Sequence, residues 1–156
     1  MVESIDAIIS EKAVRLFEKF NVFTRAELES RAEIQYEAYA KALNIEARAM
    51  IDIASKHIIP AVIKYTKDLA DTVNAVKMAG ADAEVQSDIL NEVSRLLKET
   101  RNALKKLEEV TYAACDKQEG KEQAFWFYEE VFPVMALLRK TRMPVLFLLV
   151  YHMLHK

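Results

Sequence analysis

The chain has 156 residues, of which 22 are Lys or Arg and 24 are Asp or Glu, so its formal net charge is −2. This near balance argues against nucleic acid as the main partner. Two glycines and three prolines are too few for the tight turns of a sheet-rich fold, whereas abundant Ala, Leu, Glu and Lys favour helix. The composition therefore predicts an all-α protein.

The first predicted helix covers Glu11–Phe20. Ser10 can cap its N-terminus, and Asn21 can close it in the left-handed conformation. A second helix is predicted to start at Thr24, because Thr24 and Glu27 have the spacing of a capping box.

This second helix has no stop signal before Pro60. A proline lacks the backbone N–H and clashes with the carbonyl group four residues earlier, so we predict a kink at this position. Helical periodicity then resumes through residues 61–78. Gly80 is predicted to end the helix, and Asp82 can cap the next one.

Residues 83–117 have the clearest helical periodicity, and Gly120 marks a turn before a final helix at residues 122–140, which contains Pro133. The seam of the 83–117 helix is expected to consist of Val93, Leu96, Leu97, Thr100, Ala103, Leu104, Leu107, Val110, Thr111 and Ala114. We predict an up-and-down helical bundle with one long kinked helix, in a domain at residues 1–140.

The opening half of the long helix carries two apolar stripes. The broader stripe is predicted to contain Leu28, Ala32, Tyr36, Tyr39, Leu43, Met50 and Ile53, with Gln35, Glu46 and His57 as buried polar structural residues. Ile34, Ala38 and Ile45 form the second stripe. A helix with two apolar faces needs two sets of neighbours, so the second stripe is a candidate interface.

Two further candidate contact surfaces lie toward the C-terminus. Trp126 points away from the predicted packed arc of its helix, which contains Ala124, Tyr128, Val131, Phe132 and Met135. It is either a surface contact or a side chain covered by its neighbours. In the atypical apolar tail, residues 141–156, a helix from about Pro144 would present Leu146, Phe147 and Val150 to the bundle or across a two-fold to a second copy.

The motifs of common catalytic sites are not found. Gly80 and Gly120 are too far apart for a phosphate-binding loop. None of the three histidines follows a Glu at the spacing of a di-iron bundle, and we interpret the spacing of His152 and His155 as coincidence. Cys115 is expected to be a small buried thiol. We therefore assign no catalytic, cofactor-binding or metal residue.

The location is expected to be the cytoplasm. A single cysteine allows no internal disulfide and suits a reducing compartment. The N-terminus lacks the pattern of a signal peptide, and the longest apolar run, Val145–Tyr151, is far shorter than the ~20 residues that span a bilayer. We expect no membrane partner.

Residues 16–65, LFEKFNVFTRAELESRAEIQYEAYAKALNIEARAMIDIASKHIIPAVIKY, resemble the C-terminal helical region of the type III glutamine synthetases. The resemblance continues in EEVFPVMALLR and covers roughly residues 10–140. It rests on the order and spacing of Leu16-Phe17, Val22-Phe23-Thr24, Glu27-Leu28, Ser30-Arg31, Glu33-Ile34, Glu37, Tyr39, Ile45-Glu46-Ala47, Pro60-Ala61, Tyr65, Val131, Pro133, Met135, Leu138 and Arg139. After Arg139 the chain departs from the family pattern, which continues with an acidic segment and Trp-Pro-x-Pro-Thr-Tyr.

The resemblance implies a non-catalytic structural or oligomerisation module of an ATP-dependent glutamate–ammonia ligase. Members of the family assemble as large rings, and an upstream catalytic barrel holds ATP, a divalent metal and glutamate. The expected partners are that catalytic domain or other copies of the chain. One alternative remains open, a free-standing helical binding or signalling bundle that engages a protein through the Ile34, Ala38 and Ile45 stripe. The three histidines argue against a third reading, a bundle metalloenzyme.

Overall fold

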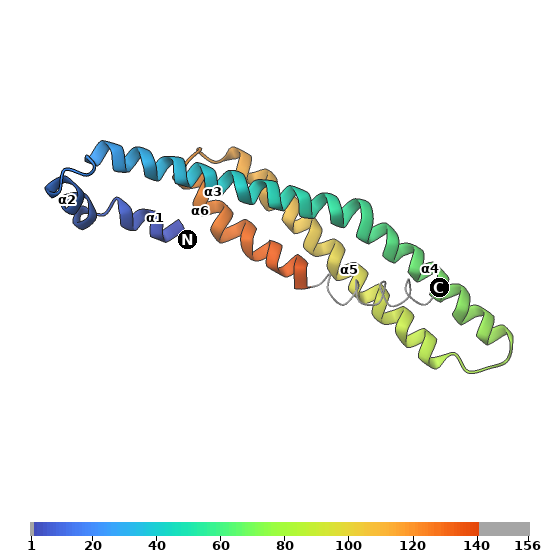
Figure 1. Cartoon of the computed structure of the whole chain (residues 1–156). Helices are drawn as coiled ribbons and strands as arrows, with labels where there is room; N and C mark the ends of the chain where they lie inside the picture. The colour runs from blue at the N-terminus through green and yellow to red at the C-terminus, as the bar shows by residue number, and fades with distance from the viewer. Residues whose placement is uncertain (1, 141–156) are drawn as a thin grey trace. The chain divides into compact units, whose positions relative to one another are not determined.

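The computed structural model describes residues 2–140, which fold into helices joined by short turns, with no strand in that range (Figure 1). The prediction of an all-α protein is confirmed. The chain forms two compact units. Among the described residues, unit 1 consists of 2–48 and 109–133, and unit 2 of 49–108 and 134–140. The predicted tail at 141–156, including Leu146, Phe147 and Val150, lies outside the described residues.

Unit 1 begins with two short helices that precede the long one. Its elements are α1 (Val2–Ile8), α2 (Glu11–Lys19), the first part of α3 (Arg25–Ile53), the last part of α5 (Glu84–Ala113), a 3-10 turn (Ala114–Asp116), α6 (Lys121–Trp126) and a π turn (Phe127–Val131). α1 was not predicted from the sequence. Its seven residues are held by packing, since Val2 and Ile5 are buried.

The helix ends of unit 1 follow the predicted capping chemistry. The Ser10 hydroxyl accepts a hydrogen bond from the backbone N–H of Ala13 at 3.4 Å, and Asn21 has a φ of 53°. The N–H of Thr24 donates to Glu27 Oε2 at 2.8 Å, while the N–H of Glu27 donates to Thr24 Oγ1 at 3.3 Å. These reciprocal bonds are the predicted capping box.

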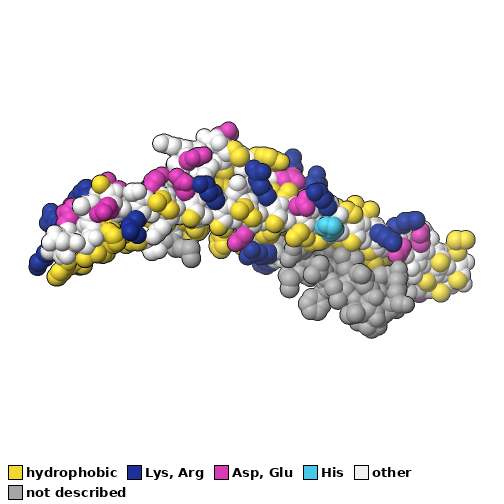
Figure 2. All heavy atoms as spheres, turned by 45° about the horizontal axis from the view of Figure 1, so that its top comes forward, with side chains coloured by type: hydrophobic (Ala, Val, Ile, Leu, Met, Phe, Trp, Pro, Cys, Tyr) yellow, Lys and Arg dark blue, Asp and Glu magenta, His cyan; other side chains and the backbone are white. Residues whose placement is uncertain are grey.

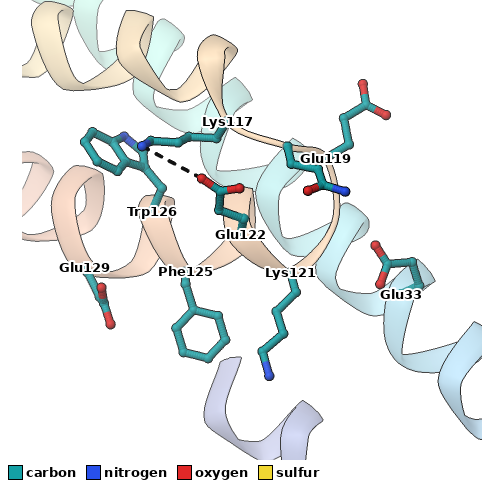
Figure 3. A pocket seen from close by; sticks show the side chains of 9 residues that line it. Glu33, Lys117, Glu119, Lys121, Glu122, Phe125, Trp126 and Glu129 are labelled. Atoms are coloured by element: carbon teal, nitrogen blue, oxygen red, sulfur yellow. Dashed lines mark ion pairs between the residues drawn. The ribbon is translucent and has the colours of Figure 1, made fainter.

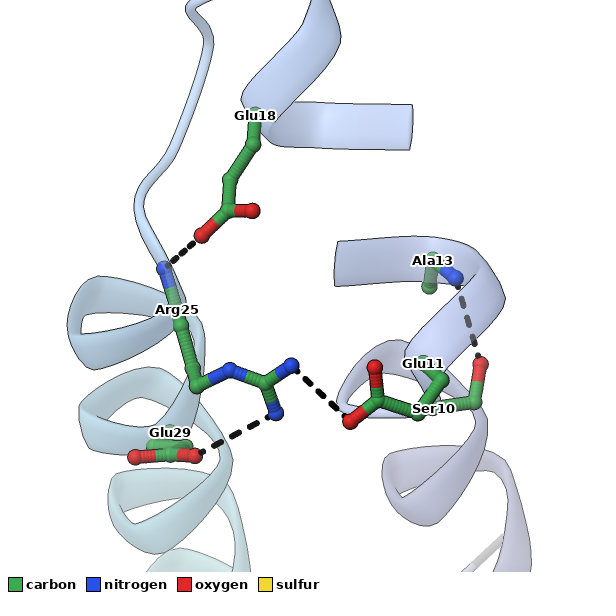
Figure 4. Close-up of polar contacts among 6 residues, drawn as sticks. All are labelled: Ser10, Glu11, Ala13, Glu18, Arg25 and Glu29. Carbon is green, nitrogen blue, oxygen red and sulfur yellow. Dashed lines mark hydrogen bonds and ion pairs between the residues drawn. The ribbon is translucent and has the colours of Figure 1, made fainter. Parts of the chain in front are cut away.

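Arg25 connects the start of α3 to α2 (Figure 4). Its guanidinium donates to Glu11 Oε1 at 2.9 Å, and its backbone N–H donates to Glu18 Oε1 at 3.3 Å. The first turn of a helix has unsatisfied N–H groups, so the Glu18 carboxylate serves as an additional acceptor there. The two glutamates fix the direction in which the chain enters α3.

The buried side of α3 in unit 1 differs in part from the predicted stripe. It contains Leu28, Ala32, Tyr36, Ala40, Leu43 and Ala47. The prediction that Gln35, Glu46 and His57 are buried is wrong, because all three are exposed. Leu28, Ala32, Tyr36 and Leu43 are buried as predicted, but the buried side is turned toward Ala40 and Ala47, and these small residues pack where the prediction placed larger or polar ones.

Unit 2 contains the end of α3, a π turn (Ala54–Ile58), α4 (Ile59–Met78), most of α5 and the helical residues from 134 to 140. α4 and α5 pack through a cluster of Ile58, Val62, Val93 and Leu96, with Tyr65, Leu69 and Leu97 against it. The predicted α5 seam is confirmed, because its members are buried except for the half-buried Leu97 and Val110.

Each of the two prolines within residues 2–140 follows a π turn. Pro60 comes two residues after the turn at Ala54–Ile58, and Pro133 stands at the same distance from the turn at Phe127–Val131. The residue before each proline donates its N–H to the carbonyl five residues earlier, Ile59 to Ala54 and Phe132 to Phe127. The wider turn relieves the clash that proline causes in an α-helix, so helical backbone continues over 54 residues, from Arg25 to Met78.

Two local predictions are corrected. Phe132 is 46% exposed, because the helix buries the side that contains Phe127 and Val134 instead of the side assigned to Phe132. Cys115 is exposed as well, since it follows the buried Ala114 in the 3-10 turn after α5 and faces away from it.

Candidate functional site

A hollow in unit 1 lies between α3, the loop after α5 and α6, and has a volume of about 630 Å³ (Figure 3). Glu33 comes from α3, Lys117 and Glu119 from the loop, and Lys121 from the first residue of α6. The full lining is Glu33, Lys117, Gln118, Glu119, Lys121, Glu122, Phe125, Trp126 and Glu129. Four carboxylates and two ammonium groups thus share one open surface.

Gly120 brings the loop against α3. It has a φ of 89°, which residues with a side chain disfavour, and a Cβ at this position would overlap the Glu33 carboxylate. The Glu33 carboxylate therefore occupies the space in which any other residue would place its side chain. The sequence predicted the turn at Gly120 but not this close approach.

Trp126 is half-buried and anchored to α5. Its indole N–H donates to the Val110 carbonyl at 3.0 Å, and the Lys117 ammonium lies 4.3 Å from the centre of its ring system. Lys117 Nζ is also 3.9 Å from Glu122 Oε1 (Figure 3). Lys117 covers one face of the half-buried ring, and this does not decide between the two arrangements considered for it. Its role in a contact with another protein stays a prediction.

A polar node joins α1, α3 and α6 beside this hollow. Asp6 accepts hydrogen bonds from the Tyr36 hydroxyl at 2.5 Å and from Lys121 Nζ at 2.5 Å. Lys121 also lies 5.5 Å from the centre of the Phe125 ring, and the Tyr36 and Phe125 rings are 6.4 Å apart. One aspartate thus links helices that are distant in the sequence.

The titration of this node follows from its hydrogen bonds. Those from Lys121 and Tyr36 to the carboxylate lower the pKa of Asp6. Burial of the ring, followed by the hydrogen bond to Asp6, raises the pKa of Tyr36. Asp6 is therefore ionised and Tyr36 neutral near pH 7, and the node serves to hold three helices together rather than to exchange protons.

The remaining surface of residues 2–140 offers few groups for cofactor chemistry. In this range no group of three or more His, Cys, Asp and Glu side chains has the arrangement of a metal site. No helix in the same range has both the length and the apolar character needed to cross a membrane. The charged side chains that line the hollow can form ion pairs and hydrogen bonds with a partner. Lys117 and Lys121 compensate part of the negative charge of its four glutamates.

The candidate interface on α3 is exposed. Ile34 is 64% and Ile45 is 70% exposed, and Ala38 between them is exposed as well. Asp6 and Lys121 were not identified as functional residues from the sequence. The one available signal was the position of Lys121 directly after the Gly120 turn, where a charged side chain can reach another element.

Comparison with known proteins connects the chain to one family. Residues 1–77 match the glutamine synthetase C-terminal domain family. The type-3 glutamine synthetase of Dictyostelium discoideum is 39% identical over 74 residues, 47% of this chain and 10% of the relative. The glutamine synthetase of Butyrivibrio fibrisolvens is 31% identical over 134 residues, 85% of this chain and 19% of the relative. The glutamine synthetase of Bacteroides fragilis is 26% identical over 124 residues, which are 76% of this chain and 17% of the relative. The chain thus spans between about a tenth and a fifth of the length of these relatives.

Proposed function

Because residues 1–77 belong to the glutamine synthetase C-terminal domain family, we propose that the chain is a non-catalytic structural module of a type III glutamate–ammonia ligase. In this role it would contact the catalytic part of the enzyme or other copies of itself. ATP and a divalent metal would be held by that catalytic part and not by this chain. The proposal includes a cytoplasmic location, as expected from the single cysteine.

The observation that carries the proposal is the pair of opposite apolar sides on α3. One side is buried within unit 1 by residues such as Leu28, Tyr36 and Leu43. On the other side, Ile34 and Ile45 have more than half of their surface exposed. A helix that buries one apolar side in its own core and presents another has the properties of an assembly element.

The non-catalytic part of this proposal is tested with the purified chain. We expect no glutamine formation from glutamate, ammonia and ATP with magnesium, and no heat of ATP binding in calorimetry. The Butyrivibrio enzyme, assayed under the same conditions, is the positive control. Saturable ATP binding at micromolar concentration, or glutamine formation above the enzyme-free rate, would show that the chain has chemistry of its own.

A further inference from the structure

One side of α5 is apolar along most of the helix but is buried over only part of it. Consecutive residues are separated by ~100°, so a single arc of ~40° contains Val85, Ile89, Leu96, Ala103 and Leu107. The last three are at most 5% exposed, whereas Ile89 is 38% and Val85 is 68% exposed. Among the described residues, the cover on this side is nearly complete from Leu96 onward and incomplete before it. Figure 2 shows hydrophobic side chains on the surface at this end of unit 2, where α4 turns into α5.

The segment after Gly120 returns along α5 and supplies part of the cover. Trp126 donates to the Val110 carbonyl, and farther along Leu137 and Ala103 line one groove of about 350 Å³. As the residue numbers rise on this segment they fall on α5, so the two run antiparallel (Figure 1). The described residues end at position 140, and the last apolar side chain beside the groove, Leu137, is 44% exposed.

The next part of the chain has the length to continue along α5. If Leu137 is level with Ala103 and the segment goes on as an antiparallel helix, residues 141–156 are level with residues 84–99. These 16 positions extend ~24 Å and reach the start of α5. The whole uncovered part of the apolar side is therefore within reach.

The side chains of residues 141–156 suit this surface. Val145–Tyr151 is a continuous apolar run, which can cover exposed apolar side chains. Lys, Arg and His occur in residues 141–156, but Asp and Glu do not. The stretch 84–92 of α5 has the opposite character, with Glu84, Asp88 and Glu92 but neither Lys nor Arg. Apolar contact and opposite charge thus favour the same pairing.

We propose that the apolar side of α5 at Val85 and Ile89 is the docking surface for residues 141–156 of the same chain. The docked segment continues the helical residues 134–140, so that unit 2 has a third helix beside α4 and α5 along the length of α5. This inference goes beyond the proposed role in a synthetase and does not depend on it, because it concerns a contact within one chain.

The experiment measures disulfide formation in the full chain, with Cys115→Ser removing the natural thiol. Ile89→Cys is combined in turn with a second cysteine at each of four consecutive positions, so that every side of a helix is sampled. The four second substitutions are Leu148→Cys, Leu149→Cys, Val150→Cys and Tyr151→Cys. With a mild oxidant, at least one pair should form a disulfide within one chain.

The matched control moves the first cysteine to the other side of α5. Asn91 is exposed and lies ~160° around the helix from Ile89, within one turn of it. The fastest pair with Ile89→Cys should form its disulfide at least tenfold faster than the same second cysteine paired with Asn91→Cys. Equal rates at all four positions would overturn the proposal.

Non-reducing gels separate disulfides within one chain from those between two chains. Disulfides that join two chains, in place of those within one, would assign the surface to a second copy and overturn the proposal as well.

A second measurement needs no cross-link. Ile89→Asp places a charge on the docking surface and should increase chymotrypsin cleavage within Val145–Tyr151 at least tenfold. Ile34→Asp, at a position that is 64% exposed in unit 1, is the control and should leave this cleavage unchanged. Circular dichroism checks that both variants keep the wild-type helix content. Unchanged cleavage in a folded Ile89→Asp variant would contradict the proposal, and the disulfide rates decide it if that variant does not fold.

Discussion

Each of the two units is stabilised by a different kind of contact between its own helices. In unit 1, Asp6 bonds to Tyr36 and Lys121, and Trp126 bonds to the Val110 carbonyl, so polar contacts connect separate helices. In unit 2, α4 and α5 pack through the aliphatic cluster around Val62 and Val93, while Arg95 pairs with Glu92 and Glu99 of its own helix. Polar contacts between helices specify one arrangement of short elements, whereas a long helix pair can rely on apolar periodicity.

The largest effect is expected from the aromatic core of unit 1. Phe127 is 2% exposed, so Phe127→Ala should lower the free energy of unfolding by about 3–5 kcal/mol, through lost burial and the cavity left behind. Phe132→Ala, at 46% exposure, is the matched control and should cost less than ~1 kcal/mol. Urea denaturation followed by circular dichroism measures both. Equal costs would mean that Phe132 belongs to the core after all.

The two glycine turns should differ in sensitivity. Gly120→Ala forces alanine into a φ of 89° and a ψ of −130°, a region that glycine alone adopts readily, and should cost about 2–3 kcal/mol, whereas the exposed end of Glu33 can swing aside. Gly80→Ala meets a similar φ of 77° but has nothing within 4 Å of the added Cβ, so about 1 kcal/mol is expected. The same unfolding assay applies. If the two variants lose equal stability, the backbone conformation at Gly120 is no more restrictive than that at Gly80.

The hydroxyl of Tyr36 should contribute about 1 kcal/mol. Tyr36→Phe keeps the buried ring and removes the hydrogen bond to Asp6, which leaves one acceptor less well satisfied. Tyr112→Phe, at a position that is 70% exposed, should be neutral. Hydrogen exchange of the α1 amides provides a second measurement, because the bond joins α1 to α3. Unchanged protection in α1 would contradict a role of Tyr36 in fastening it.

The contribution of Asp6 should depend on pH in a defined direction. The pKa of Asp6 in the folded protein is lowered, so its carboxylate stabilises the fold above its unfolded pKa of about 4, and this contribution is lost as the pH falls through the folded value. Wild type should therefore be more stable than Asp6→Asn at pH 7, with a difference that shrinks in acid. Thermal unfolding at several pH values checks this. If the stability difference between wild type and Asp6→Asn does not change with pH, the ionised carboxylate of Asp6 is not its source.

The smallest effect is expected at the surface of unit 2. Arg95→Ala removes ion pairs at 2.6 Å to Glu92 and Glu99, but these side chains are about half exposed, so Tm should fall only slightly. The difference should disappear in roughly 1 M salt, where such pairs are screened. Arg25→Ala removes the ion pair between Arg25 of α3 and Glu11 of α2, and it is the comparison from unit 1. A larger fall in Tm for Arg95→Ala than for Arg25→Ala would contradict the conclusion that polar contacts contribute more to unit 1 than to unit 2.

Local chemistry explains which parts of the fold could be predicted. Ser10, Thr24 with Glu27, Asn21 and the seam of α5 were predicted because caps and periodicity act within a few residues of the chain. The phase of α3 was predicted only in part. Leu28, Ala32, Tyr36 and Leu43 are buried as predicted, but the neighbouring helices turn the buried side toward Ala40 and Ala47, away from the predicted polar positions. This is why Gln35, Glu46 and His57 are exposed.

The candidate site lay further beyond the reach of the sequence. Lys121 bonds to Asp6 across 115 positions of the chain, and Gly120 lies against Glu33, which is also distant in the sequence. No local sequence pattern encodes contacts between such distant residues. The seven residues of α1 are also too few to show a recognisable helical periodicity. The resemblance to the glutamine synthetases supplied the family, but it assigned no role to these residues.

The most direct test of the account is whether this chain can supply the structural part of a related enzyme. The Butyrivibrio glutamine synthetase would be shortened by the 134 residues that match this chain, and its sedimentation would be measured with and without the purified chain. We predict that the shortened enzyme sediments as a smaller species than the intact enzyme, and that added chain binds it and restores the larger one. A shortened enzyme that keeps its full size, or that fails to bind the chain, would contradict a structural role for this module.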